Sequence, residues 1–308
     1  MVDLSVQLAP AHQRGLLLAN PVMTASGTFG YGIEYSELVD INRLGAIVCK
    51  GTTLKPSEGN PQPRLVETAW GVANSIGLEN VGVEAVIKDK ATIWAKWQVP
   101  VIVNIAGETI DEYVEVAARL DDVAGVSGIE VNISCPNITS GGMEFGMSPE
   151  SAAEVTAAVK AATSLPVIVK LSPNVTDIGE IALVVSEAGA DAITLINSVQ
   201  GMAIDINERQ PSLGNFVGGI SGPAIKPIAL YMVYKVAGIV DRPIIGCGGI
   251  SCADDVLEFL MAGASAVQVG TANLTSPQAS LDILEGIEQF MKRENLKNME
   301  PIIGKARN

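Results

Sequence analysis

One recurring unit dominates the sequence: a short apolar run ending in small or polar residues, then a longer segment rich in Ala, Glu and Val. Apolar runs without alternation are typical of parallel strands that are covered on both faces. Glycines placed just before two of the runs, at Gly189 and Gly263, are typical helix stops. The eight predicted strands are Asn20–Ser26, Ala46–Lys50, Val99–Ile105, Gly128–Ile133, Pro166–Leu171, Ala192–Asn197, Pro243–Gly246 and Ala266–Gly270.

Helices are predicted between these strands. Thr109–Asp122 begins with a Thr cap and an acidic first turn, and Ser148–Ala162 begins with Ser, Pro and Glu. Thr176–Ala188 and Ala253–Ala262 each end at a glycine. Eight strands alternating with helices fit an open doubly wound sheet or a closed barrel, and the count of eight favours an α/β fold of the (β/α)8 type, the TIM barrel.

The chain has 308 residues, which is enough for one such barrel. No shift in composition and no long linker marks a boundary, so residues 1–308 are expected to form a single domain. Two stretches, Thr52–Val83 and Ser198–Ile220, are long and loop-like. Long loops after barrel strands often cover the site, and these two are expected to do so.

Composition excludes several classes of function. The formal net charge of −14 disfavours binding to nucleic acid. A single His and the lack of a Cys-x-x-Cys pair disfavour a zinc site and a Ser-His-Asp triad, so no metal is expected. The chain has no export signal and no run of about 18 apolar residues, so a cytoplasmic protein without a membrane span is expected.

Polar residues gather where the predicted strands end, and in a barrel these ends meet at one rim. Lys50 and Lys170 end otherwise apolar strands, where a Lys with only a structural role would be costly to bury. The alternative is that both side chains reach out to solvent. The last two strands end in Gly248-Gly249 and Gly270-Thr271, and glycine pairs at these two places are typical of phosphate sites. No G-x-G-x-x-G follows the first strand, which disfavours a Rossmann fold.

Cys135 lies just past the fourth predicted strand, among residues that can hydrogen-bond. A cysteine in this position suits a base or a nucleophile, and the alternative is a buried inert side chain. Cys49, Cys247 and Cys252 fit the buried, inert interpretation better.

At this point the sequence resembles the class 1 dihydroorotate dehydrogenases. Asn132-Ile-Ser-Cys-Pro-Asn137 looks like their active-site segment, and Asn74-Ser-Ile-Gly-Leu-Glu-Asn80 looks like their substrate-binding loop. These two motifs are specific, whereas the glycine pairs in Gly246–Ile250 and Val269–Ala272 are not. The segments Gly201–Asp205 and Gly218–Pro227 are similar to the NAD-linked subclass 1B.

The resemblance implies an FMN-dependent barrel that oxidises (S)-dihydroorotate to orotate in pyrimidine biosynthesis. It implies that Cys135 removes a proton from C5 and that hydride passes from C6 to N5 of the flavin. Implied substrate-binding residues are Lys50, Asn74, Ser75, Ile76, Gly77, Leu78, Asn132, Asn137, Asn197 and Ser198. Implied FMN-binding residues are Ser26, Lys50, Gly51, Asn104, Asn132, Lys170, Ile196, Gly222, Gly248, Gly249, Gly270 and Thr271.

The resemblance also implies a partner subunit carrying FAD and a 2Fe–2S cluster, which passes electrons to NAD, and a heterotetramer built on a homodimer of this chain. The sequence lacks a cysteine cluster for such a centre, which agrees with that division. Other interpretations stay open at this point: a fumarate-dependent class 1A enzyme, another FMN barrel that reduces pyrimidines, and a barrel kept only for binding.

Overall fold

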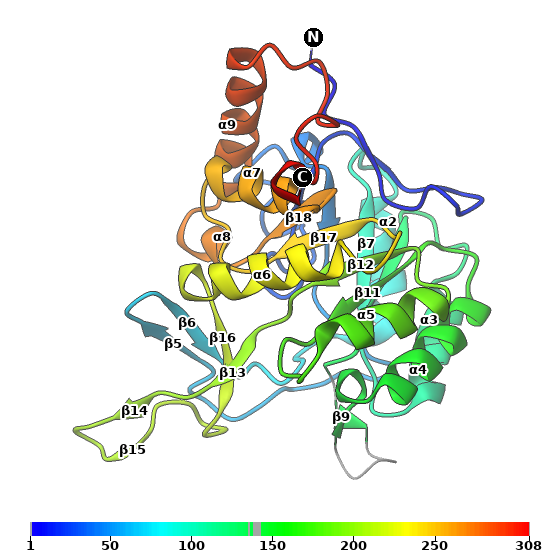
Figure 1. The fold of residues 1–308 in the computed structure, drawn as a ribbon. Helices are drawn as coiled ribbons and strands as arrows, with labels where there is room; N and C mark the ends of the chain where they lie inside the picture. Colours follow the sequence, from blue (N-terminus) through cyan, green and yellow to red (C-terminus); the bar gives the residue numbers. More distant parts are fainter. Residues whose placement is uncertain (1, 135, 138–142, 308) are drawn as a thin grey trace.

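Eight short parallel strands close into a barrel in the computed structural model, which describes residues 2–134, 136–137 and 143–307 (Figure 1). Each strand pairs with the next along the chain, and the last pairs with the first. The strands in order are β3 (Val22–Thr24), β4 (Ala46–Val48), β7 (Val101–Ile105), β8 (Gly128–Asn132), β11 (Val167–Leu171), β12 (Ala192–Leu195), β17 (Ile244–Cys247) and β18 (Ala266–Val269). The predicted (β/α)8 barrel is therefore confirmed, with strands a few residues shorter than expected.

Helices surround the barrel and cover the outer faces of its strands (Figure 1). A helical segment of three parts, α1 (Gly82–Ala85), η2 (Val86–Ala91) and α2 (Thr92–Trp94), precedes β7. The longer helices are α3 (Ile110–Leu120), α4 (Pro149–Ala162), α5 (Ile178–Glu187), α6 (Lys226–Val236), α7 (Ala253–Ala262) and α9 (Ala279–Arg293), and α8 (Thr271–Thr275) is short.

The predicted caps explain where several helices begin. The Thr109 side chain accepts a hydrogen bond from the Glu112 N–H at 3.3 Å, and Ser148 caps α4 in the same way. Helix α5 instead begins after Asp177, two residues later than predicted. Helix α3 buries Tyr113, Val116, Ala117 and Leu120, which share one face at helical spacing and pack toward the barrel.

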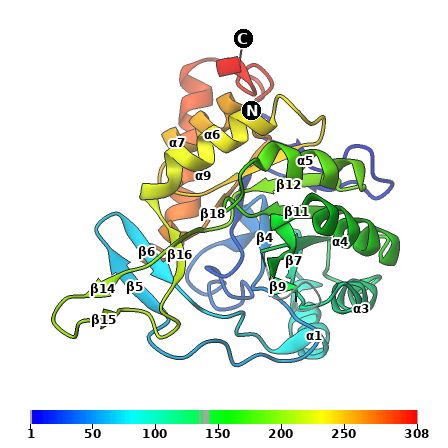
Figure 2. The ribbon, with the colours of Figure 1, turned by 60° about the horizontal axis from the view of Figure 1, so that its bottom comes forward.

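The two stretches predicted as loops contain paired strands, so that interpretation was wrong. Strands β5 (Leu65–Thr68) and β6 (Gly71–Asn74) join β13 (Val199–Gly201) and β16 (Gly218–Ser221) in one antiparallel sheet. The sheet lies beside the barrel, and a hairpin of β14 (Ile204–Asp205) and β15 (Gln210–Pro211) projects from it (Figure 2). Glycine is needed at the contact, because a Cβ on Gly218 would lie 2.2 Å from the Asn74 carbonyl oxygen.

Shorter elements complete the described chain. Two-residue strands pair as β1 (Val6–Gln7) with β2 (Leu17–Leu18) and as β9 (Pro136–Asn137) with β10 (Met143–Glu144). Short 3-10 turns are η1 (Ile41–Arg43), η4 (Phe145–Met147), η5 (Pro223–Ile225) and η6 (Lys305–Arg307). Among the helices of the described residues, none combines the length and the apolar character that crossing a membrane requires.

Candidate functional site

The carboxyl ends of the eight parallel strands form one rim, and the predicted site residues lie along it. Lys170 lies within β11 and Asn132 is the last residue of β8. Ser26, Lys50 and Asn197 each follow a strand by two residues, while Gly248 and Gly270 follow β17 and β18 directly. Closure of the barrel therefore places residues from distant parts of the chain along one rim.

Lys170 is buried near this rim, with 4 % of its surface exposed. Its Nζ lies 3.0 Å from Gln268 Oε1, 3.5 Å from Ser26 Oγ and 3.8 Å from Cys247 Sγ. Burial acts to lower the pKa of Lys170, but Cys247 and Glu130 outweigh it and raise the pKa above its ordinary value. Lys170 therefore stays a cation at neutral pH, and the alternative in which its side chain reaches solvent does not hold.

Two titratable groups lie beside the Lys170 ammonium, Cys247 on β17 and Glu130 on β8. Burial raises the pKa of the Cys247 thiol, while the neighbouring Lys170 ammonium acts to lower it. The Glu130 carboxyl oxygen Oε1 lies 4.0 Å from Lys170 Nζ, and the Glu130 side chain is fully buried.

Amide and hydroxyl groups form a second cluster at the ends of β8 and β12. The Asn197 Nδ2 donates to Asn132 Oδ1 at 3.1 Å and to Ser134 Oγ at 3.0 Å. The Ser198 backbone N–H donates to Asn197 Oδ1 at 2.8 Å. These contacts bring together three of the predicted substrate-binding residues, and they present groups that both donate and accept hydrogen bonds.

The antiparallel sheet carries Asn74 to the same cluster. Asn74 Nδ2 donates to the Gly219 carbonyl oxygen at 3.1 Å, and a Cβ on Gly219 would lie 2.0 Å from Ser198 Oγ. In the loop after Asn74, Ser75 is buried and its N–H donates to the Arg64 carbonyl oxygen at 2.7 Å. The Ser75 N–H is thus engaged within the chain, which weakens the prediction that it contacts substrate.

Lys50 differs from Lys170 in its surroundings. Its side chain is about one-quarter exposed, and its Nζ lies 3.7 Å from Glu79 Oε2. Next to it, a Cβ on Gly51 would lie 3.2 Å from Leu78 Cδ2 and 3.3 Å from Asn104 Oδ1. Lys50, Gly51, Leu78 and Asn104 therefore form one neighbourhood at the rim.

The glycines after β17 and β18 provide a cradle that suits a phosphate group. Gly248 and Gly249 have φ angles of +128° and +75°, which glycine adopts without strain, and successive N–H groups in such a turn can bind an anion. A Cβ on Gly248 would lie 3.5 Å from Ile196 Cγ1, and a methyl of Thr271 lies near Gly222. A buried cation at one end and a glycine cradle at the other fit a flavin mononucleotide.

Two predicted residues cannot be placed in the same detail. Cys135, the predicted base, lies outside the described residues. Asn137 belongs to strand β9, and its backbone alone is described. Ile76 and Gly77 lie in the loop between β6 and α1, where Gly77 has a φ of +72°.

A cluster of polar side chains inside the barrel was not predicted from the sequence. Glu130, Thr194 and Gln268 are each fully buried within strands β8, β12 and β18. The signal was available, because each is a polar residue directly between two apolar residues of a strand, where burial without a partner is costly.

The other cysteines differ from expectation in one case. Cys49 and Cys247 are buried as predicted, and burial raises the pKa of Cys49 to about 12. Cys252 is exposed at the first turn of α7, so the prediction that it is buried was wrong. Cys247 also contacts Lys170, so it belongs to the site and is not merely a packing residue.

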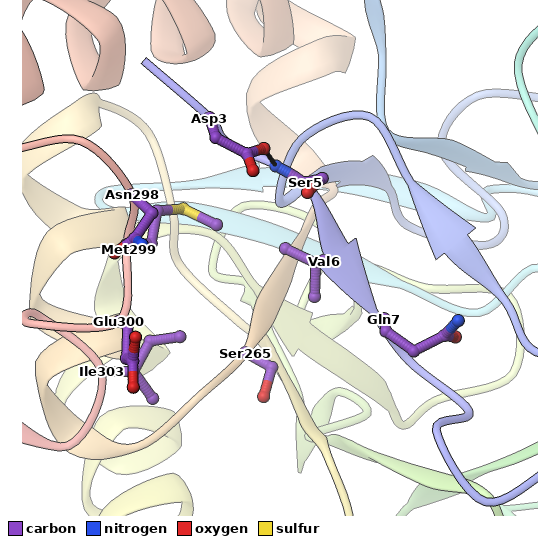
Figure 3. Close-up of a pocket in the computed structure, with 9 residues that line it drawn as sticks. All are labelled: Asp3, Ser5, Val6, Gln7, Ser265, Asn298, Met299, Glu300 and Ile303. Atoms are coloured by element: carbon purple, nitrogen blue, oxygen red, sulfur yellow. Dashed lines mark hydrogen bonds between the residues drawn. The ribbon is translucent and has the colours of Figure 1, made fainter.

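Two surface hollows lie away from this rim. One is lined by residues near both termini: Asp3, Ser5, Val6, Gln7, Ser265, Asn298, Met299, Glu300 and Ile303 (Figure 3). Ser265 precedes the first residue of β18, so this hollow lies at the amino ends of the strands. The second hollow includes His12 and Ser164, near the amino end of β11. Barrel enzymes use the opposite end for catalysis, so neither hollow is the candidate site.

Comparison with known proteins identifies the family to which the chain belongs. Residues 11–291 match the family model described as dihydroorotate dehydrogenase. The chain is 56 % identical over 289 residues to a protein of Desulforamulus reducens, covering 94 % of this chain and 95 % of the relative. It is 53 % identical over 302 residues to a protein of Pelobacter propionicus, covering 98 % of each. Both relatives are named dihydroorotate dehydrogenase B (NAD(+)), catalytic subunit.

Proposed function

Because this chain belongs to the dihydroorotate dehydrogenase family, we infer that it oxidises dihydroorotate to orotate in pyrimidine biosynthesis, as the catalytic subunit of an NAD-linked enzyme. The observation that carries this conclusion is the similarity along nearly the whole chain to relatives of that name. These relatives are named for NAD(+), which favours the NAD-linked subclass over the fumarate-dependent one.

We propose that FMN binds along the rim described above, within the one barrel formed by residues 1–308. When bound, FMN supplies a two-electron acceptor for the hydride that leaves dihydroorotate. The Lys170 ammonium would offset negative charge at the ring, and the glycine cradle would hold the phosphate. The residues proposed to hold FMN are Ser26, Lys50, Gly51, Asn104, Asn132, Lys170, Ile196, Gly222, Gly248, Gly249, Gly270 and Thr271.

The amide cluster is proposed to orient the flat, polar substrate. Asn132 and Asn197 already hydrogen-bond each other, so their amides are held in place before substrate arrives. Asn74 and Ser198 close the cluster from the side of the antiparallel sheet, and Lys50 would attract the substrate carboxylate. The further residues proposed to contact substrate are Ser75, Ile76, Gly77, Leu78 and Asn137.

Cys135 is proposed as the base that removes a proton from C5 of dihydroorotate. In the sequence it follows Asn132 by three residues and Ser134 by one, and the side chains of both take part in the amide cluster. A thiol transfers protons best when its pKa lies near the working pH.

A partner subunit follows from the names of the relatives, which call each of them a catalytic subunit. We propose that the partner carries FAD and a 2Fe–2S cluster and passes electrons to NAD. We further propose that two copies of this chain form the core of a heterotetramer. Cytoplasmic location is proposed because thiols such as Cys49 and Cys247 stay reduced there.

Anaerobic stopped-flow absorbance tests this function directly. The enzyme, isolated with any subunit that copurifies, is mixed with dihydroorotate while flavin absorbance is recorded. Wild-type protein is expected to bleach rapidly, and Cys135→Ala is expected to retain FMN but to bleach at least about a hundredfold more slowly. Cys252→Ser is the matched control, because it removes an exposed thiol outside the proposed site.

Two results would contradict the proposal. Wild-type protein that contains FMN but shows no reduction by dihydroorotate would reject the substrate. A near-normal rate for Cys135→Ala would reject Cys135 as the base while leaving the substrate assignment intact.

A further inference from the structure

Glu130 connects five of the eight barrel strands beneath the proposed flavin site. The side chain lies on β8 and is fully buried. Its Oε1 accepts from Asn104 Nδ2 on β7 at 2.8 Å and lies 4.0 Å from Lys170 Nζ on β11. Its Oε2 accepts from Thr194 Oγ1 on β12 at 2.9 Å and from Gln268 Nε2 on β18.

Stability alone is a poor explanation for this arrangement. Burying a carboxylate and an ammonium is costly, and apolar residues of similar size often stabilise a core as well or better. The fully buried Glu130 nevertheless meets hydrogen-bond donors on both of its oxygens. Unlike apolar residues, this network fixes the orientation of the polar groups around Glu130.

The carboxylate determines how two neighbouring amides are oriented. A carboxylate only accepts hydrogen bonds, so Asn104 and Gln268 must each present an NH2 group to Glu130. The Gln268 Oε1 is then directed to Lys170 Nζ, which donates to it at 3.0 Å. The Asn104 Oδ1 is directed toward Gly51 at the rim. One buried residue therefore orients a cation and an amide near the rim.

We propose that Glu130 is a positioning residue, which holds Lys170 and Asn104 in the orientation that binds FMN. The inference rests on the proposed function, since FMN is the group that these two residues would contact. Glu130 itself lies below the rim and acts through its neighbours.

The charge of Lys170 gives this proposal a distinctive pH dependence. Among the described residues, the titratable groups facing its ammonium are Glu130 from β8 and Cys247 from β17. Other elements contribute the uncharged Ser26 and Gln268. Without Glu130, Lys170 loses one of the two groups that oppose the effect of its burial, so its pKa would fall and the ammonium would be lost at a lower pH than in the wild type.

Binding of FMN to flavin-free enzyme provides the test, with affinity followed by quenching of flavin fluorescence at about pH 6.5 and about pH 9. Glu130→Gln keeps the size of the side chain but removes its charge, and its amide cannot accept from both sides. FMN binding to this variant is expected to weaken about tenfold more at the higher pH than at the lower one. The wild-type enzyme is expected to bind FMN with nearly the same affinity at both pH values.

Asp191→Asn is the matched control. Asp191 is also a buried carboxylate, bonded to Lys160 and to the Val167 N–H, but it lies at the amino ends of the same strands. This control is expected to keep the wild-type affinity and pH profile. If Glu130→Gln does not fold, Thr194→Val, which removes one donor to Glu130, is expected to bind FMN about threefold more weakly.

The outcomes separate this inference from the function on which it rests. Wild-type affinity and pH profile in Glu130→Gln, or wild-type affinity in Thr194→Val, would overturn the positioning role alone. A wild-type enzyme that binds no FMN would overturn both proposals.

Discussion

Replacing Lys170 with Met tests the charge balance at the centre of the barrel. Lys170 Nζ lies 4.0 Å from Glu130 Oε1, and their side chains are 5 % and 0 % exposed. At an effective dielectric constant of about 20, two unit charges at this separation interact by about 4 kcal/mol. Lys170→Met is therefore expected to lower the free energy of unfolding of the flavin-free chain by about 4 kcal/mol, because Glu130 stays buried without its cation.

Chemical denaturation followed by circular dichroism measures this change. Adding Glu130→Gln to Lys170→Met removes the unpaired buried charge. The free energy of unfolding of the double variant is therefore expected to be about 2 kcal/mol higher than that of Lys170→Met. Arg43→Met serves as the control, because it breaks an exposed ion pair of 3.0 Å with Glu285 and should cost less than about 1 kcal/mol. A double variant no more stable than Lys170→Met would refute the charge-pair reasoning.

Three further predictions concern the cradle, the single histidine and the electron acceptor. Gly249→Ala should lower the free energy of unfolding by at least about 1–2 kcal/mol, since φ is +75° and the new Cβ would lie 2.7 Å from the Lys226 backbone nitrogen. The variant should also release FMN on dialysis, and an unchanged flavin content would contradict the proposal that this glycine holds the phosphate. Burial lowers the pKa of His12, whose Nδ1 accepts from the Arg14 N–H at 3.2 Å, so its contribution to stability is present above about pH 6.5 and lost as the pH falls through the lowered pKa. Urea titrations should show that His12→Gln loses less free energy of unfolding than the wild type when the pH is lowered below about 6.5. Equal losses in the two proteins would count against this role of His12. Dihydroorotate oxidation should reduce NAD only when the partner subunit is present, and turnover of fumarate by the chain alone would argue for the other subclass.

Much of the fold could be predicted from local patterns. The eight apolar runs became the eight barrel strands, because a strand buried on both faces needs a continuous apolar stretch. The antiparallel sheet escaped prediction for the opposite reason. Its four strands are short and three of them contain glycine, and Asn74 meets its partner Gly219 across 145 residues of sequence. No local signal reports such a pairing.

The rim residues could be named from the sequence because parallel strands put all their carboxyl ends on one side. A residue that ends a strand, such as Asn132, is therefore near the site wherever the strand lies in the barrel. The substrate was predicted from the motifs around Cys135 and Asn74, which resemble those of a known family. For the rim residues that end a strand, position along the strand was sufficient to place them near the site.

What only the tertiary structure decided is which buried polar groups meet. Glu130 lies 64 residues from Thr194 and 138 from Gln268, and no spacing in the sequence relates them. They come together because the barrel closes and its register brings inward-facing side chains of different strands into contact. Sequence patterns determine each element, whereas contacts between elements depend on how all of them are packed at once.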